Sequence, residues 1–253
     1  MNENNLSDFF SAASTTLTRV VKQAEEKLTN AEITQFDSET QCLINRSELI
    51  QKNIRDLINN VTCLVFPNPA LRAEQMIMEK LNRPIKDRIS TSEALGDQCN
   101  EISEKILENT EMGALMNKTG QTQICLAATE KEYERATILN VLEPLKNFLN
   151  GDCKRALEAK KELDSVRLDL DISKTKLKYA RNDKKQYAEN HVNECLQKFN
   201  TKVDYTKNEL RQFEKNFAMQ SPIIKALIKV QLDYHKNCVT HLENLSSSLD
   251  TPN

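Results

Sequence analysis

The sequence is poor in glycine and contains no tryptophan: its 253 residues include 4 glycines and 6 prolines. An average chain of this length would hold about 18 glycines, so turn-rich β-sandwiches, barrels and doubly wound sheets are disfavoured. The spacing of the glycines excludes a phosphate-binding loop as well, because it fits neither GxGxxG nor GxxxxGK. These glycines are Gly96, Gly113, Gly120 and Gly151.

Cysteine pairs, long apolar runs and excess charge are also missing. The seven cysteines are spread along the chain without a CxxC pair, their number is odd, and no signal peptide precedes them, which predicts reduced thiols in a cytoplasmic protein. No apolar run approaches the roughly 18 residues of a membrane-spanning helix. The net charge of −2 argues against non-specific binding of nucleic acid.

Long amphipathic helices are what the sequence does contain. Apolar or small residues recur at steps of three and four from Ile33 to Leu64 and from Val192 to Leu245, and residues 121–185 read as helical between them. Three such stripes cannot each be buried alone, so the helices must pack side by side. The pattern predicts an all-α fold, an elongated, kinked, three-helix antiparallel coiled coil.

Breaks in these helices are predicted from proline, glycine and capping residues. Interior prolines kink helices, and Ser or Thr caps a helix start. The expected features are an end at Pro67–Pro69, a restart capped by Thr91 or Ser92, a possible break at Gly113 and Gly120, kinks at Pro144 and Pro222, a turn near Tyr187–Asn190 with Asn190 as the cap, and an end at Ser246–Ser248.

The first 28 residues carry one continuous apolar face. Such a segment can lie in a membrane interface as an amphipathic helix. Its Ser- and Thr-rich polar face favours the recognition of lipid packing defects over the recognition of anionic lipid head groups. The alternative is that the face packs on the bundle as an ordinary arm. The residues expected to insert are Leu6, Phe9, Phe10, Leu17, Val20 and Val21.

A basic run precedes the expected turn. Six cations fall within twelve residues and are opposed only by Asp183: Lys174, Lys176, Lys178, Arg181, Lys184 and Lys185. A Lys or Arg near an anionic leaflet contributes up to about 1 kcal/mol of attraction. The run therefore predicts a head-group contact at the end of the rod, the alternative being a solvated helix face without a target.

Seven stretches, in order along nearly the whole chain, resemble the endophilins, and within them the endophilin B branch of the N-BAR proteins. They are Glu26-Lys27 with Ala31-Glu32 and Asp37; Phe66-Pro67-Asn68-Pro69; Arg72 with Glu79-Lys80-Leu81-Asn82-Arg83; Arg88-Ile89 leading to Leu95-Gly96; Glu143-Pro144-Leu145-Lys146-Asn147-Phe148; Arg167-Leu168-Asp169-Leu170-Asp171 with Lys174-Thr175-Lys176-Leu177-Lys178; and Gln231-Leu232-Asp233-Tyr234-His235.

The resemblance implies a crescent-shaped BAR homodimer, or a heterodimer with a paralogue. It implies an inserting helix over residues 1–28, a BAR coiled coil over 29–249 and a tail at 250–253. An insert at about 67–96 would place Met76, Ile77 and Met78 against lipid, and Lys174, Lys176 and Lys178 would touch head groups. The chain departs from the family in its lysine-poor start and in lacking a C-terminal Src-homology module, so no proline-rich ligand is expected.

No catalytic set or cofactor site is expected. No carboxylate sits with a nucleophile in a glycine-bearing turn, and the spacing of Cys238 and His241 fits packing in the helix seam better than a zinc site. Phe199, Phe213, Phe217 and Tyr234 are predicted as core residues.

The predicted function is the binding and curving, or curvature sensing, of an anionic or loosely packed phospholipid membrane. Family likeness points to Golgi, mitochondrial outer, autophagic or endocytic membranes. The alternative is a coiled-coil adaptor for a small GTPase or another protein, with little membrane bending.

Overall fold

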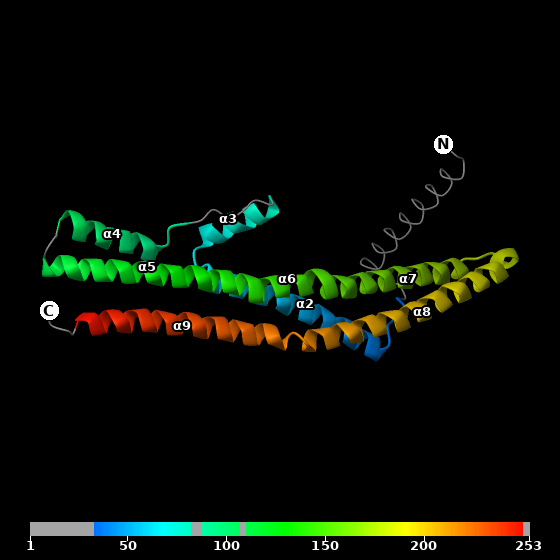
Figure 1. Ribbon diagram of the computed structural model, residues 1–253. Coiled ribbons are helices and arrows are strands. Elements are labelled where there is room, and N and C mark those ends of the chain that lie inside the picture. The colour runs from blue at the N-terminus through cyan, green and yellow to red at the C-terminus, as the bar shows by residue number, and fades with distance from the viewer. Residues whose placement is uncertain (1–32, 82–87, 107–109, 250–253) are drawn as a thin grey trace, which may run out of the picture. The chain divides into compact units, whose positions relative to one another are not determined.

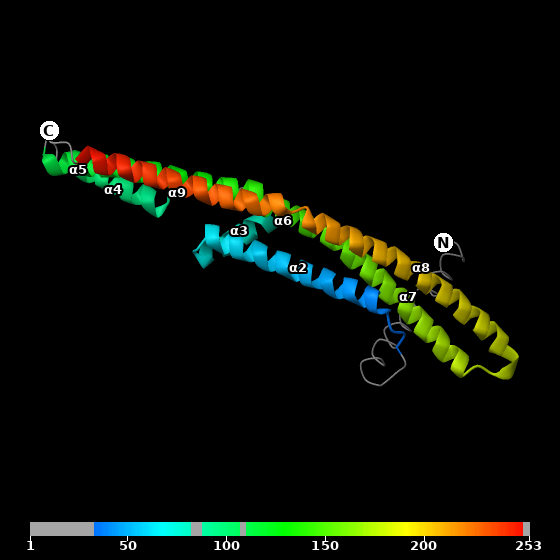
Figure 2. The same ribbon diagram turned by 90° about the horizontal axis from the view of Figure 1, so that it is seen from below.

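The structure is a computed structural model that describes residues 33–81, 88–106 and 110–249. Across these ranges the chain forms α-, 3₁₀- and π-helices and no β-strand, which confirms the all-α prediction (Figures 1 and 2). The chain divides into two compact units. Unit 1 takes its described residues from Met1–Lys52 and Leu149–Ala218, and unit 2 from Asn53–Phe148 and Met219–Asn253.

Unit 1 is built on an antiparallel helical hairpin. Its arms are α7 (Lys154–Lys178) and α8 (Lys185–Ala218), which lie side by side in both views (Figures 1 and 2). The first half of α2 (Ser38–Val65) is tied to them by ion pairs from Arg46 to Glu214 and from Lys160 to Glu48. The buried core takes residues from all three helices: Leu43 and Ile44 from α2, Leu163 and Leu170 from α7, and Phe199, Leu210 and Phe213 from α8.

Unit 2 contains the second half of α2 and six further helical segments. α4 (Thr91–Lys105) lies along α5 (Glu111–Thr137), and α5 lies along α9 (Ser221–Leu249). The remaining segments are α3 (Pro69–Lys80), the π-helical η1 (Ile138–Leu142) and α6 (Glu143–Phe148). Tyr133 of α5 stacks on Tyr234 of α9 with 4.7 Å between ring centroids, and burial raises the pKa of Tyr234 to about 12.

The start of α2 is capped by Asp37, because its carboxylate accepts hydrogen bonds from the backbone N–H (2.9 Å) and the hydroxyl (2.6 Å) of Thr40. These bonds, with a smaller contribution from Lys207 of α8 at 3.1 Å, lower the pKa of Asp37 to about 2. The predicted helix from Ile33 therefore begins five residues later, at Ser38.

Removing this cap is expected to destabilise unit 1 in a pH-dependent way. The pKa of Asp37 lies below its ordinary value of 3.8, so the carboxylate stabilises the fold above about pH 4, and this contribution disappears as the pH falls towards 2. Asp37→Ala should lower the free energy of unfolding by about 1 kcal/mol at pH 7, and the deficit should narrow by pH 2. Urea unfolding checks this, with the exposed neighbour in Ser38→Ala as control; a deficit independent of pH would contradict it.

The turn between the arms of the hairpin lies earlier than predicted. α7 ends at Lys178, the 3₁₀-helix η3 spans Asn182–Lys184, and α8 begins at Lys185. The expected turn near Tyr187–Asn190 is therefore wrong, and Asn190 lies within α8 instead of capping it. The heptad pattern of the last helix becomes regular only at Val192, which made the turn look later than it is.

The cap of α4 also differs from the prediction. Ser90, and not Thr91 or Ser92, is the N-cap: its hydroxyl accepts from the backbone N–H of Glu93, whose side chain accepts from the backbone N–H of Ser90. This capping box satisfies two free backbone donors. α5 begins after Thr110, whose hydroxyl caps Gly113 at 2.9 Å, so no break occurs at Gly113 or Gly120.

Gly96 and Gly120 instead lie where α4 and α5 approach each other closely. A Cβ added to Gly120 would lie 2.2 Å from Oδ1 of Asn100 and 2.8 Å from the backbone oxygen of Gly96. Gly120→Ala should therefore cost about 1–3 kcal/mol of unfolding free energy through overpacking. Gly151→Ala is the control, because nothing lies within 4 Å of its added Cβ; equal thermal stability of both variants would contradict the close approach.

The two prolines that were expected inside helices occupy different positions. Pro144 follows η1, whose wide turn brings the N–H of Glu143 to the carbonyl of Ile138; a proline removes a backbone donor and crowds the preceding turn, which favours such a bulge. Pro222 is not interior at all: α8 ends at Ala218 and Pro222 lies in the first turn of α9, where proline is tolerated. α9 continues to Leu249, past the predicted end at Ser246–Ser248.

Candidate functional site

The six cations of the basic run surround the turn of the unit 1 hairpin, and we call them the tip cluster. The prediction that all six precede the turn is wrong. Lys174, Lys176 and Lys178 lie in the last turns of α7, Arg181 in the connection, Lys184 in η3, and Lys185 at the start of α8. All six are exposed to solvent. The helix dipole places partial negative charge at the end of α7, which favours the lysines there.

Across the described part of the chain, no acidic side chain forms an ion pair with any member of the tip cluster. Elsewhere in unit 1 many cations are neutralised across helices. Lys202 pairs with Glu162 at 2.6 Å, and Lys207 with Asp37 and Glu39 at 3.1 and 3.3 Å. Unpaired cations at one end of a helical hairpin can bind an anionic surface without first breaking an internal bond.

Lys174 differs from the other members of the cluster. Its Nζ donates a hydrogen bond of 2.7 Å to the hydroxyl of Thr34, and Thr34 in turn binds the buried carboxylate of Asp171. The sequence pattern put Lys174 with the head-group lysines and predicted no partner for it. Its partner is 140 residues away, a contact that local spacing cannot reveal.

Two tyrosines, one within the tip cluster and one just after it, were missed by the sequence analysis. Tyr179 directly follows the last residue of α7, Tyr187 lies in the first turn of α8, and each is 78% exposed. Tyrosine is enriched where apolar and wet environments meet, because its ring is apolar and its hydroxyl polar. Their position within a basic run was the signal that could have found them.

Comparison with known proteins identifies the family. The BAR domain family matches residues 12–251. The chain belongs to the BAR domain family. This BAR protein is 29% identical to endophilin-B1 of Rattus norvegicus over 238 residues, which cover 94% of this chain and 65% of that protein. It is 32% identical to endophilin-B2 of Bos taurus over 177 residues, covering 70% of this chain and 45% of the relative.

The fold has a counterpart among solved structures. The crystal structure of a BAR protein from Galdieria sulphuraria superposes with a TM-score of 0.57 at 11% sequence identity, covering 86% of this chain and 100% of that one. This likeness supports the coiled-coil BAR fold alone. The family match and the endophilin-B relatives confirm the predicted family. The chain spans about 65% of the length of the endophilin-B1 relatives.

The expected inserting residues are only partly within the structure. Leu6, Phe9, Phe10, Leu17, Val20 and Val21 lie outside the described residues. In the insert, Ile77 is exposed and Met78 is half-buried, while the side chain of Met76 is not described. Leu81, four residues after Ile77, is exposed too, so two large aliphatic side chains share one side of this segment.

Unit 2 exposes a long apolar stripe on α9. Of the residues on this helix, only Ile223 is fully buried. The exposed members recur at steps of three, four and seven: Ile224, Ile228, Leu232, Val239 and Leu242. Phe217 and Tyr234, predicted as core with Phe199 and Phe213, are exposed and half-buried respectively, which corrects that prediction.

Within the described ranges, no group of three or more His, Cys, Asp or Glu side chains is arranged to hold a metal ion. Cys238 and His241 are both half-buried on α9. None of the described helices is long and apolar enough to cross a bilayer.

Proposed function

We propose that this BAR protein acts as a homodimer that binds anionic or loosely packed phospholipid membranes and induces or senses their curvature. The observation that carries the proposal is the tip cluster, in which six exposed cations without acidic partners among the described residues surround one turn. A heterodimer with a paralogue would present the same chemistry. The proposed place of action is the cytoplasmic surface of Golgi, mitochondrial, autophagic or endocytic membranes.

The electrostatics of the tip cluster support a peripheral contact. Each Lys or Arg near an anionic leaflet contributes up to about 1 kcal/mol, and the attraction decays over a Debye length of about 8 Å. One cluster therefore supplies several kcal/mol at most, and two clusters in a dimer act together. Charge contacts of this size hold a protein reversibly, and stable attachment takes a second, apolar signal.

The second signal in this proposal is apolar insertion. The face that includes Phe9 and Phe10 would enter one leaflet, and the exposed Ile77 would add a smaller contact from the insert. Inserting side chains into one leaflet expands that leaflet relative to the other, which favours curvature. This is the step that an adaptor for another protein would not need.

The apolar stripe on α9 supports dimerisation through unit 2. Large contiguous apolar surfaces on soluble proteins mark interaction sites. A coiled-coil stripe that is left uncovered within one chain fits the same stripe on a second copy, related by a two-fold axis. Dimerisation also doubles the number of tip clusters available to one membrane.

The insertion step is tested by Phe9→Glu/Phe10→Glu. Two carboxylates on the apolar face should reduce tubulation of liposomes at least about tenfold, since each replaces roughly 2 kcal/mol of ring burial by a charge that resists the acyl region. Electron microscopy of the liposomes measures tubulation, and binding to small and large vesicles separates curvature sensing from induction.

The control for this test is Ser7→Glu/Ser11→Glu, which makes the same change of charge on the opposite, polar face. It should retain most of the tubulation. If the phenylalanine variant and the tip-cluster variant described in the Discussion both tubulate normally, the proposed function is wrong and a protein-binding adaptor becomes the better interpretation.

A further inference from the structure

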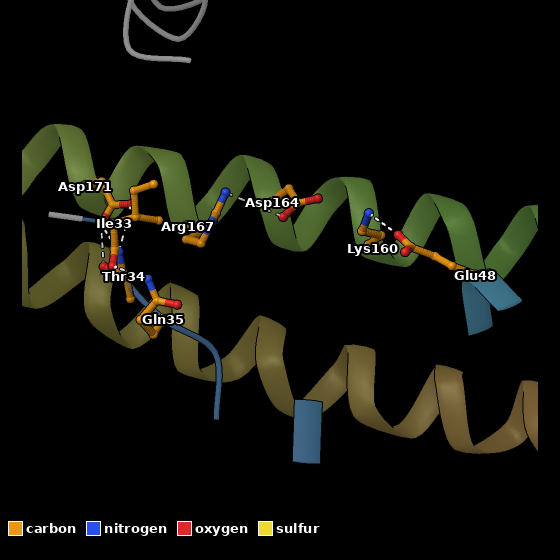
Figure 3. A network of polar contacts seen from close by, with 8 residues as sticks. All are labelled: Ile33, Thr34, Gln35, Glu48, Lys160, Asp164, Arg167 and Asp171. Carbon is orange, nitrogen blue, oxygen red and sulfur yellow. Dashed lines mark hydrogen bonds and ion pairs between the residues drawn. The ribbon is translucent and has the colours of Figure 1, made fainter. Parts of the chain in front are cut away.

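The short stretch before α2 is attached to α7 by hydrogen bonds to a buried carboxylate. Asp171 is 2% exposed, and its Oδ1 and Oδ2 lie 3.1 and 3.3 Å from the backbone N–H of Thr34. The hydroxyl of Thr34 also donates to Asp171 (Figure 3). A buried carboxylate is costly unless its hydrogen bonds are satisfied, so Asp171 holds Thr34 in one place.

Lys174 completes this arrangement from one turn further along α7. Its ammonium donates to the same hydroxyl that binds Asp171, so the chain of hydrogen bonds runs from Lys174 through Thr34 to Asp171. We call Thr34, Asp171 and Lys174 the anchor.

A second contact holds the same stretch two residues later. The ring of Phe36 stacks on Phe199 of α8 with 6.1 Å between centroids, and the guanidinium of Arg167 lies 5.3 Å from the Phe36 centroid. Phe36 therefore contacts both arms of the hairpin. Figure 3 shows the stretch from Ile33 to Gln35 against α7, with Arg167 between Asp171 and Asp164.

The anchor shares Lys174 with the tip cluster and lies close to its other members along α7. Asp171 precedes Lys178, the last residue of the helix, by seven residues, which is about 10 Å at 1.5 Å per residue. The 33 residues that precede Thr34 include the apolar face expected to insert into lipid. The chain leaves the anchor, therefore, within about one head-group diameter of the residues expected to bind head groups.

We propose that the anchor is a positioning device, in which Asp171 and Lys174 hold Thr34 so that the N-terminal apolar face enters the bilayer at a set distance from the tip cluster. The inference rests on the proposed function and adds a requirement to it. Insertion and head-group binding must be mechanically joined. If the chain before Thr34 were not held, the apolar face would bind lipid without transmitting force from the bilayer to the hairpin. Affinity would depend little on the anchor, and bending would depend on it strongly.

The test uses the full chain with Thr34→Val or Asp171→Asn. Thr34→Val keeps the shape of the side chain and the backbone N–H of residue 34. It removes the hydroxyl that links Lys174 to Asp171. Both variants should tubulate liposomes at least about tenfold less than the wild type, while binding to the same liposomes weakens less than about threefold. Thr34→Ser should restore tubulation.

The matched control is Glu48→Gln. It breaks the ion pair between Lys160 and Glu48, which also joins the N-terminal part of the chain to α7 but does not involve Thr34 (Figure 3). Hydrogen exchange of the peptide containing Thr34 should accelerate in the anchor variants and not in Glu48→Gln. If Glu48→Gln lost tubulation as strongly as Thr34→Val, the role would be general stability of the bundle, and the inference would be overturned.

A linker insertion separates positioning from stability. Six Gly and Ser residues placed between Asn30 and Ala31 leave the anchor in place but lengthen the connection to the apolar face. Tubulation should fall as in Thr34→Val, with no change in thermal unfolding, and the two changes together should add little to either alone.

If Thr34→Val tubulates like the wild type and the tip-cluster variant loses binding, the positioning role of the anchor is rejected and the proposed function stands. The opposite pattern, with a tip-cluster variant that binds and tubulates normally, would reject the proposed function itself.

Discussion

Reversing the charge of Lys176, Lys178 and Arg181 to glutamate is expected to abolish most binding to anionic vesicles. These three cations are exposed and form no ion pair with any described residue, so their replacement should leave the helices of unit 1 intact. At about 1 kcal/mol per cation, losing three weakens binding about 100-fold for each chain, and the added repulsion weakens it further. Lys174 is left unchanged because it belongs to the anchor.

Salt dependence and a matched control sharpen this test. Co-sedimentation of the wild type with anionic vesicles should decrease steeply as ionic strength rises, and the weak residual binding of the variant should lose that dependence. Lys52→Glu/Lys154→Glu/Lys215→Glu makes the same change of net charge at exposed positions elsewhere in unit 1 and should bind much better. Equal binding by both triple variants would show that total charge, not the tip cluster, drives attachment.

Placing acids on the α9 stripe is expected to convert the proposed dimer into a monomer. Ile228 and Leu232 are 60% and 49% exposed, and Ile228→Asp/Leu232→Asp would put four carboxylates into a two-fold interface. Each lost aliphatic contact costs roughly 1.5 kcal/mol, and each buried acid adds a desolvation penalty. The dissociation constant should therefore rise at least about a thousandfold.

Light scattering coupled to size exclusion measures this change directly. Leu49→Asp/Leu196→Asp is the control, since both leucines are exposed apolar residues of unit 1, outside the proposed interface. It should remain a dimer. If the α9 variant keeps the mass of a dimer at all concentrations, the stripe serves another partner and the proposed assembly is wrong.

Helices that depend on local periodicity were predicted well. The heptads from Ile33 to Leu64 and from Val192 onward became α2, α8 and α9, and the pair Pro67 and Pro69 separates α2 from α3, because neither proline can extend the hydrogen-bond ladder behind it. The family likeness also came from residues in order along the chain, and the BAR domain match confirms it.

Features that depend on long-range approach were predicted poorly. Gly120 looked like a break, yet it lies inside α5, where only a residue without a Cβ lets α4 come close. The hairpin turn was placed too late, because residues 179–184 contain neither Gly nor Pro to mark it. Lys174 looked equivalent to Lys176, and only its distant contact with Thr34 separates them.

By itself, the sequence established helices, their amphipathic faces and the gathering of six cations within twelve residues, since these features repeat or cluster over a few turns of chain. Tertiary structure alone decided which cations are free, which glycines admit a neighbouring helix and which apolar positions of α9 stay uncovered. Those properties belong to pairs of residues far apart in sequence. Burial, neutralisation and exposure arise only when folding brings two surfaces together. The sequence pattern of an apolar stripe is the same whether the surface that covers it belongs to the same chain or to another.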